Sequence, residues 1–208
     1  MVNHFALFLP GFATAKKIQW NLRLIYQNLY IEILLVLSLV IHMGTNIALY
    51  RKRQRLASSK EDGKVVKGSS ELKAHRMAGY FLALTIAGHV GAVRVVPLFY
   101  LDDPSEFDYS FVAATMERIS GHVFSIYLAF LGMAGGWHLL FGTRSALSTL
   151  SGSSIIGKAV PLPLKFLALL SHVGIILAVL SLSEVFYVIR EMNSKAAMHE
   201  KFVAHFGF

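Results

Sequence analysis

The chain has 208 residues, of which 55% are hydrophobic and only 15% are charged, a balance that helical membrane proteins reach easily and soluble domains rarely reach. It contains no cysteine, which excludes disulfides, iron–sulfur clusters and thiolate-bound zinc. The net charge of +8 would suggest nucleic acid in a soluble protein, but here the basic residues are concentrated in one segment and no recognisable nucleic-acid-binding module accompanies them. We therefore expect no nucleic-acid partner.

The first segment, residues 1–28, combines short apolar patches with Pro10-Gly11 and an amphipathic run around Trp20. This pattern predicts a segment that lies in the membrane interface and does not cross it. The segment lacks the apolar core and cleavage pattern of a secretory signal. Its basic residues, without any acid before Glu32, are compatible with mitochondrial import.

Four later segments are apolar enough to cross a membrane, which takes about 20 residues of helix. They cover residues 29–50, 77–101, 119–142 and 166–189. We therefore expect an all-α fold: an integral membrane four-helix bundle over residues 29–189, followed by a C-terminal tail at 190–208.

The connections between these spans differ in charge. Loop 51–76 contains nine Lys or Arg residues against three acids, whereas loop 102–118 contains five acids against one Arg. The positive-inside rule then places loop 51–76 on the cytoplasm-like side, which in mitochondria is the matrix, and both termini on the far side. A loop this basic also attracts anionic phospholipid such as cardiolipin.

Four of the five histidines inside the predicted spans lie one per span: His42, His89, His138 and His172. The fifth, His122, opens the third span at the opposite surface, and we interpret it as an interfacial residue. An ionisable side chain at bilayer depth is costly, so it is a functional-site candidate by default. Neutral imidazole is an axial ligand of haem iron, and two of them make a six-coordinate electron-transfer haem. The alternative is that each histidine hydrogen-bonds across helices. Four histidines on four helices favour the cofactor.

Depth along the helices distinguishes the possible ligand pairs. Measured from the basic side, His42 lies about 12 Å deep, His138 about 6 Å, His172 about 9 Å and His89 about 18 Å. Helices 1 and 3 of an up-down bundle are diagonal to each other, so His42 and His138 form the best-matched pair. His89 with His172 is a second possible pair whose depths agree less well.

Charged residues near the histidines extend this prediction. Arg94 lies within the outer part of the second span and needs a partner, which could be Glu184, a haem propionate or an anionic quinone. Arg76 and Arg144 stand at inner helix ends, where they are either topology charges or propionate contacts. His75 begins the second helix at the basic surface, where snorkelling and a propionate contact would both suit it.

The run His75-Arg76-Met77-Ala78-Gly79, followed by His89 and Arg94, resembles the haem-bearing helix of the di-haem cytochrome b anchors of succinate dehydrogenase and fumarate reductase. The segments ending at His42 and around His138 resemble the neighbouring helices of that family, so the resemblance covers about residues 29–145. It implies that His42 and His138 serve one haem and that His89 serves a second. The family's additional first helix, which carries the partner of that second haem, has no counterpart here, and this favours one haem over two.

The resemblance implies a mitochondrial inner-membrane, multi-pass cytochrome b-like subunit that binds haem b and contacts ubiquinone. It would anchor the other subunits of a succinate:quinone oxidoreductase and relay electrons without catalytic residues of its own. The chain is also similar to a fungal mitochondrial four-helix family proposed to bind haem and linked to lipid homeostasis. Two alternatives remain at this point: a haem-free accessory subunit of a respiratory or ATP-synthase assembly, and a stand-alone haem or lipid-homeostasis protein.

Overall fold

The structure, a computed structural model, describes residues 7, 11–58, 70–118, 122–152, 160–185, 189, 193 and 195–204. All regular elements within these residues are helices, as the composition predicted. The chain divides into two compact units, one of Met1–Lys17 with Ser69–Phe208 and the other of Ile18–Gly68. Because the first predicted span belongs to the smaller unit, its assembly with the other three into one bundle stays a prediction.

The smaller unit consists of the end of α2 (Phe12–Tyr26) and of α3 (Leu29–Ser58). Between the two helices, the Asn28 side chain accepts a hydrogen bond of 3.0 Å from the backbone N–H of Tyr30, which satisfies one donor at the start of α3. The helix predicted over 29–50 continues through the first basic residues to Ser58. The amphipathic run of the N-terminal segment is helical as α2, and its place in the membrane interface stays a prediction.

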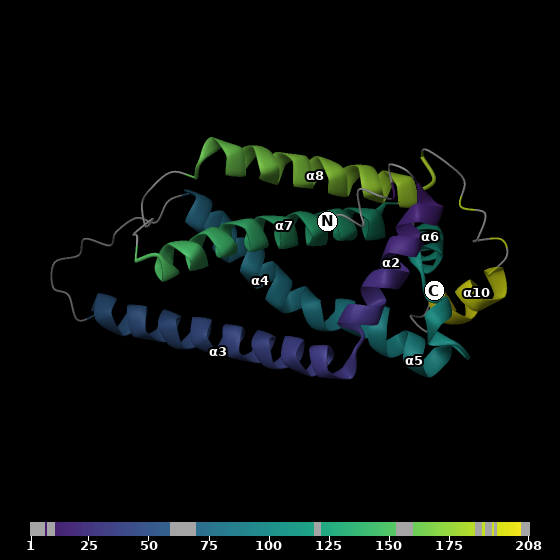
Figure 1. Cartoon of the computed structure of the whole chain (residues 1–208), viewed down its shortest axis with the longest axis horizontal. Coiled ribbons are helices and arrows are strands. Elements are labelled where there is room, and N and C mark those ends of the chain that lie inside the picture. The colour runs from purple at the N-terminus through teal and green to yellow at the C-terminus, as the bar shows by residue number, and fades with distance from the viewer. Residues whose placement is uncertain are drawn as a thin grey trace. The chain divides into compact units, whose positions relative to one another are not determined.

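The larger unit is built on α4 (Ser70–Val90), α7 (Val123–Leu150) and α8 (Leu162–Leu182), and α7 packs against both of the others (Figure 1). Lys165 at the start of α8 lies 3.8 Å from Glu71 at the start of α4, so these two helices run in the same direction. The hydroxyl of Ser125 near the start of α7 lies 3.3 Å from that of Ser183, just after α8. The three helices therefore alternate in direction, as short membrane connections require.

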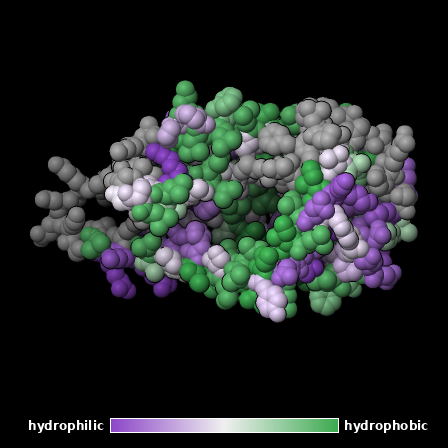
Figure 2. Space-filling model, viewed as in Figure 1, coloured by the Kyte–Doolittle hydropathy of each residue, from purple (hydrophilic) through white to green (hydrophobic). Residues whose placement is uncertain are grey.

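Four described helices are long and apolar enough to cross a membrane: Leu29–Leu56, Ser70–Tyr100, Val123–Ser148 and Leu162–Leu182. The number and order of the predicted spans are thus confirmed, while their ends shift. The second begins at residue 70 instead of 77, and the fourth ends at 182 instead of 189. Apolar residues cover much of the visible surface (Figure 2). Leu84 and Leu162 are 83% and 79% exposed, and contact with lipid would cover their apolar side chains.

The second span contains an irregular turn. After α4, a π turn at Gly91–Val95 leads into α5 (Val96–Tyr100), and the backbone N–H of Val96 bonds to the carbonyl of Gly91, five residues earlier. The cause is Pro97, which has no N–H and whose ring would clash with the carbonyl four residues before it. The wider turn lets the helix continue past the proline, so the span stays one helical rod.

Beyond the spans, loop 102–118 and the C-terminal tail are not simple connections. The loop forms η2 (Pro104–Glu106) and α6 (Tyr109–Arg118), and the tail forms α10 (Ala196–Ala204), which packs against α5 and α6. We call residues 101–118 with 195–204 the cap. Its core is a cluster of Leu101, Phe107, Phe111 and Phe202. The sequence did not predict α6 and α10, because a helix of about ten residues with one apolar face does not form a long apolar segment.

Candidate functional site

Two histidines meet where α4 packs against α7. The imidazole rings of His75 and His138 stack with 4.2 Å between centroids and 9° between planes. The Nδ1 of His138 also lies 3.3 Å from the backbone oxygen of His75. A carbonyl can only accept a hydrogen bond, so Nδ1 carries the proton and the lone pair of the neutral ring is on Nε2.

One of the two glycines beside the histidine rings, Gly79, makes this contact possible. A Cβ added to Gly79 would lie 2.9 Å from Cε1 of His138, closer than real Cβ atoms come to a ring. A Cβ on Gly142 would lie 3.6 Å from Cε1 of His75, which is ordinary contact. Gly79 therefore provides the recess on α4 in which the His138 ring lies. In the sequence, Gly79 was noted only as part of the run that resembles the cytochrome b anchors.

Aromatic rings and one buried donor complete this site, which we call the histidine pair site. Phe141 lies 4.7 Å from the His75 ring, and Trp137 stacks on Phe141 at 6.3 Å. The indole Nε1 of Trp137 is buried and has no hydrogen-bond partner within the described part of the chain. A buried donor without an acceptor costs about 1–3 kcal/mol, so this atom would gain from an oxygen-bearing ligand.

The other predicted ligands lie apart from this pair or in the other unit. His42 is an exposed residue of α3, and its Nε2 lies 3.3 Å from the amide nitrogen of Asn46. His89 is half-buried, two residues before the π turn. His172 donates from Nδ1 to the carbonyl of Ala168, one turn earlier in α8. The pairing of His42 with His138, and that of His89 with His172, therefore stay predictions.

The predicted arginine contacts stay predictions. Arg94 is a half-buried residue of the π turn. Its candidate partner Glu184 accepts a hydrogen bond of 2.7 Å from the backbone N–H of Ile189. Arg76 is exposed beside His75, and Arg144 is half-buried on α7, one and a half turns beyond His138. These positions leave a propionate contact for Arg76 and Arg144 as a prediction.

No family model, curated protein or solved structure matches this chain. The resemblance to the cytochrome b anchors therefore depends on the quoted residues alone, and membership of that family stays a prediction.

The sequence did not predict the contact between His75 and His138. The predicted second span began at residue 77, so His75 counted as a surface residue and was not compared with the histidines inside the spans. His75 lies near the start of α4 and His138 in the second half of α7, and these helices run in opposite directions. The start of α4 at Ser70, seven residues before the predicted start of the span, is what places His75 within the helix that packs on α7.

A second polar site lies in the cap, at Asp108. This carboxylate, only 5% exposed, lies 3.0 Å from the ammonium of Lys16 and 3.2 Å from that of Lys195. It also accepts hydrogen bonds from the backbone N–H and the hydroxyl of Ser110, at 2.8 Å and 2.5 Å. Burial alone would raise the pKa of Asp108, but the Ser110 bonds and the two ammonium groups outweigh it and lower that pKa.

The arrangement of Asp108, Ser110 and His199 does not resemble a nucleophilic triad. In such a triad the histidine lies between the acid and the hydroxyl. Here the hydroxyl of Ser110 lies between them, donating to Asp108 and lying 2.9 Å from Nε2 of His199. Ser110 is also completely buried. The cluster can therefore hold chain segments together, but it cannot activate a nucleophile.

Proposed function

We propose that this chain is a membrane-embedded b-type haem protein in which His138 supplies an axial imidazole to the iron. The observation that carries the proposal is the hydrogen bond from Nδ1 of His138 to the carbonyl of His75. Histidines that ligate metals nearly always donate their other ring N–H to a carbonyl or carboxylate, which sets the tautomer and orients the ring. His138 has that tautomer, with the Nε2 lone pair required of a ligand.

The surrounding residues fit a haem. Gly79 lets the His138 ring lie against α4 and so holds its orientation, and the buried N–H of Trp137 suits a carboxylate or other oxygen. Arg144 lies further along the same helix and offers the positive charge that matches a propionate. When bound, haem supplies an iron centre that changes oxidation state by one electron. The chain's own contribution is to orient the imidazole and to exclude water from it with apolar helices.

The second ligand, the further cofactor contacts, the membrane and the partner subunits are proposed from the sequence pattern. His42 would be the second axial ligand, with Asn46 releasing its Nε2 when iron binds. His89, His172, Arg76 and Arg94 are further candidates for cofactor contacts. The chain would lie in the mitochondrial inner membrane with residues 51–76 in the matrix, next to cardiolipin, and would anchor the other subunits of a succinate:quinone oxidoreductase that passes electrons to ubiquinone.

A reduced-minus-oxidised spectrum of the purified protein tests this proposal. We expect the α and Soret bands of a low-spin, bis-histidine haem, and their loss in both His42→Ala and His138→Ala. His199→Ala is the control and should retain the bands, because that ring lies in the cap against Ser110 and Phe111. A folded protein without haem absorbance would refute the proposal, and loss in His138→Ala alone would exclude His42 as the partner.

One observation favours a second candidate, a haem-free accessory subunit of a respiratory or ATP-synthase assembly. The stack and the hydrogen bond between His75 and His138 already join α4 to α7, which is the role of interhelical polar contacts in membranes. Stoichiometric co-purification with such an assembly, with no haem in the preparation, would support this candidate. Migration alone with haem bound would instead indicate a stand-alone haem protein.

A further inference from the structure

The charges of the cap connect three segments that are far apart in the sequence. Lys16 comes from α2, Asp108 from the residue before α6, and Lys195 from the residue before α10. Lys195, whose side chain is 11% exposed, also lies 2.6 Å from Glu106 and donates to its backbone carbonyl at 2.8 Å. Asp108 is thus the common partner of an N-terminal and a C-terminal ammonium group.

The C-terminal helix adds apolar contacts to this ionic one. The ring of Phe202 lies 5.4 Å from each of the Phe107 and Phe111 rings, and His199 meets the edge of Phe111 at 4.6 Å. The Ser110 hydroxyl has one hydrogen and donates it in a hydrogen bond to Asp108. In the contact between Ser110 and His199, Nε2 of His199 is therefore the donor. The docking of α10 therefore depends indirectly on the charge of Asp108 as well as directly through Lys195.

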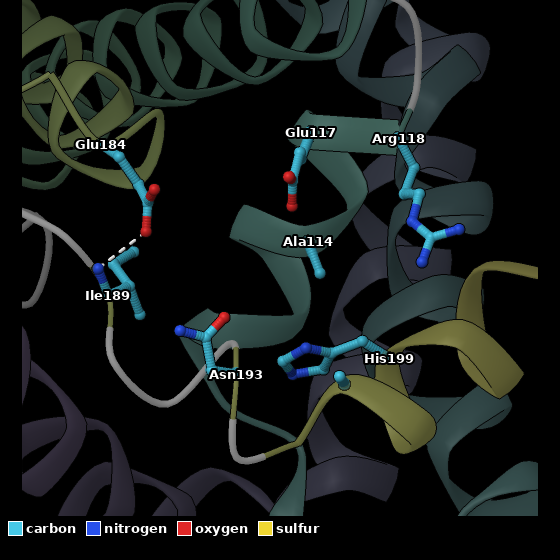
Figure 3. Close-up of a pocket in the computed structure, with 8 residues that line it drawn as sticks. Ala114, Glu117, Arg118, Glu184, Ile189, Asn193 and His199 are labelled. Carbon is cyan, nitrogen blue, oxygen red and sulfur yellow. Dashed lines mark hydrogen bonds between the residues drawn. The ribbon is translucent and has the colours of Figure 1, made fainter.

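A cavity of about 180 Å³ lies beneath this segment (Figure 3). Ala114, Glu117 and Arg118 of α6 line one wall. Asn193 and His199 line the facing wall, and Glu184 and Ile189 close the side. Ala196 at the start of α10 also lines the cavity. Ala114 is only 5% exposed although it faces the cavity. The cavity is already partly open, and moving α10 away would remove one wall and expose the Ala114 side to solvent.

The segment follows an unusual turn. It comes after Glu184, whose φ of +58° is the left-handed conformation that residues other than glycine rarely adopt. Within the described residues, the main packing partners of α10 are α5 and α6. An exposed ion pair of 3.6 Å between Arg118 and Glu200 contributes little to this docking.

We propose that α10 is a releasable strap, held closed by the ion pair between Asp108 and Lys195, and that its release opens the cavity beside Ala114. Removing one partner of a buried ion pair costs more than removing an exposed one, because the remaining charge is poorly solvated. Without Lys195, Asp108 keeps only Lys16, and without Asp108, Lys195 keeps only Glu106 as an ionic partner among the described residues. Lys16 supports the same carboxylate from outside the strap and should matter less.

The strap should also respond to acid. The groups that face Asp108 are Lys16 of α2, Lys195 beside α10 and, through Ser110, His199 of α10, while Glu106 shares Lys195. Because the pKa of Asp108 is lowered in the folded protein, the closed strap is fully stabilised above the ordinary aspartate pKa of about 3.9. That stabilisation is lost as the pH falls through the lower, folded value.

Thiol labelling of the full-length protein in detergent tests the strap, because the chain has no natural cysteine. Ala114→Cys places one thiol on the cavity wall, and its labelling rate reports opening. We expect Asp108→Asn and Lys195→Met, each in this background, to raise the rate at neutral pH by at least about tenfold, as the loss of a buried charge partner implies. Lys16→Met should raise it less.

Asp102→Asn is the matched control. Asp102 is an exposed acid in the same connection that lies outside the ionic contacts of Asp108 and Lys195, so its labelling rate should stay at the reference value. Hydrogen exchange of peptides from α7 and α10 separates local release from global unfolding. Unchanged labelling in both Asp108→Asn and Lys195→Met would overturn the proposal. Equal loss of protection in α7 and α10 in both variants would overturn it too, because the strap would then not be separable.

Discussion

Gly79→Ala offers the sharpest stability test, because its methyl group would lie 2.9 Å from Cε1 and 3.2 Å from Nδ1 of His138. The ring must move, and it then loses its hydrogen bond to His75 and its stacking. Overpacking of this kind costs about 1–3 kcal/mol, while replacing glycine with alanine inside a helix returns about 1 kcal/mol. The net loss should be about 0–2 kcal/mol.

Gly88→Ala is the matched control on the same helix, because a Cβ there meets nothing within 4 Å. The helix-propensity gain is common to both variants, so their difference isolates the overpacking term of about 1–3 kcal/mol. For a chain of this size that corresponds to about 2–12 °C in Tm.

The measurement is thermal unfolding of both variants in the same detergent, followed by circular dichroism. Gly88→Ala should melt at or above the parent temperature, and Gly79→Ala below it. The reasoning would be refuted if Gly79→Ala melted with Gly88→Ala or above it, since the recess on α4 would then not be needed by His138.

Three further predictions concern other contacts. Gly132→Ala should destabilise the packing of α7 on α8, since its Cβ would lie 2.7 Å from Cγ2 of Ile175. The double variant with Ile175→Ala should recover part of the lost Tm, and no recovery would contradict this contact. Phe202→Ala should weaken the docking of α10 by about 3–5 kcal/mol, the usual cost of truncating a buried phenylalanine, measured as faster hydrogen exchange in α10 than in α7. Burial lowers the pKa of Lys195, but its hydrogen bonds and ion pairs with Glu106 and Asp108 outweigh burial and raise that pKa. The stabilisation from Lys195 is therefore complete below the ordinary lysine value of about 10.4 and is lost as the pH rises through the raised value; an alkaline melting series should show this loss, and Lys195→Met should not.

The membrane-span pattern could be predicted from the sequence because it depends on composition over about 20 residues, and such an average tolerates errors at single positions. The ends could not. The helices of the second and third spans extend well past the apolar windows, to Ser70 and Leu150, because the helix continues through polar residues that can reach water. α6 and α10 were missed because each is short and derives its stability from burying one face in the cap.

The histidines show the same division at the level of single residues. Residue type and depth along the predicted span were enough to select His138 as a candidate ligand. Its partner in the structure, His75, lies 63 positions earlier, and whether two such side chains meet depends on how α4 and α7 are rotated about their axes. A glycine at position 79 permits that rotation, since any side chain there would hold the helices apart.

The sequence by itself determined that the protein is helical, that four of its helices can cross a membrane, and that imidazoles lie within them. These features follow from hydrophobicity and from position along one helix. Only the tertiary structure decided that His138 donates to the carbonyl of His75 and that Asp108 holds Lys16 and Lys195 together. Such contacts join positions distant in sequence, and they form only where packing brings a donor within about 3 Å of its acceptor.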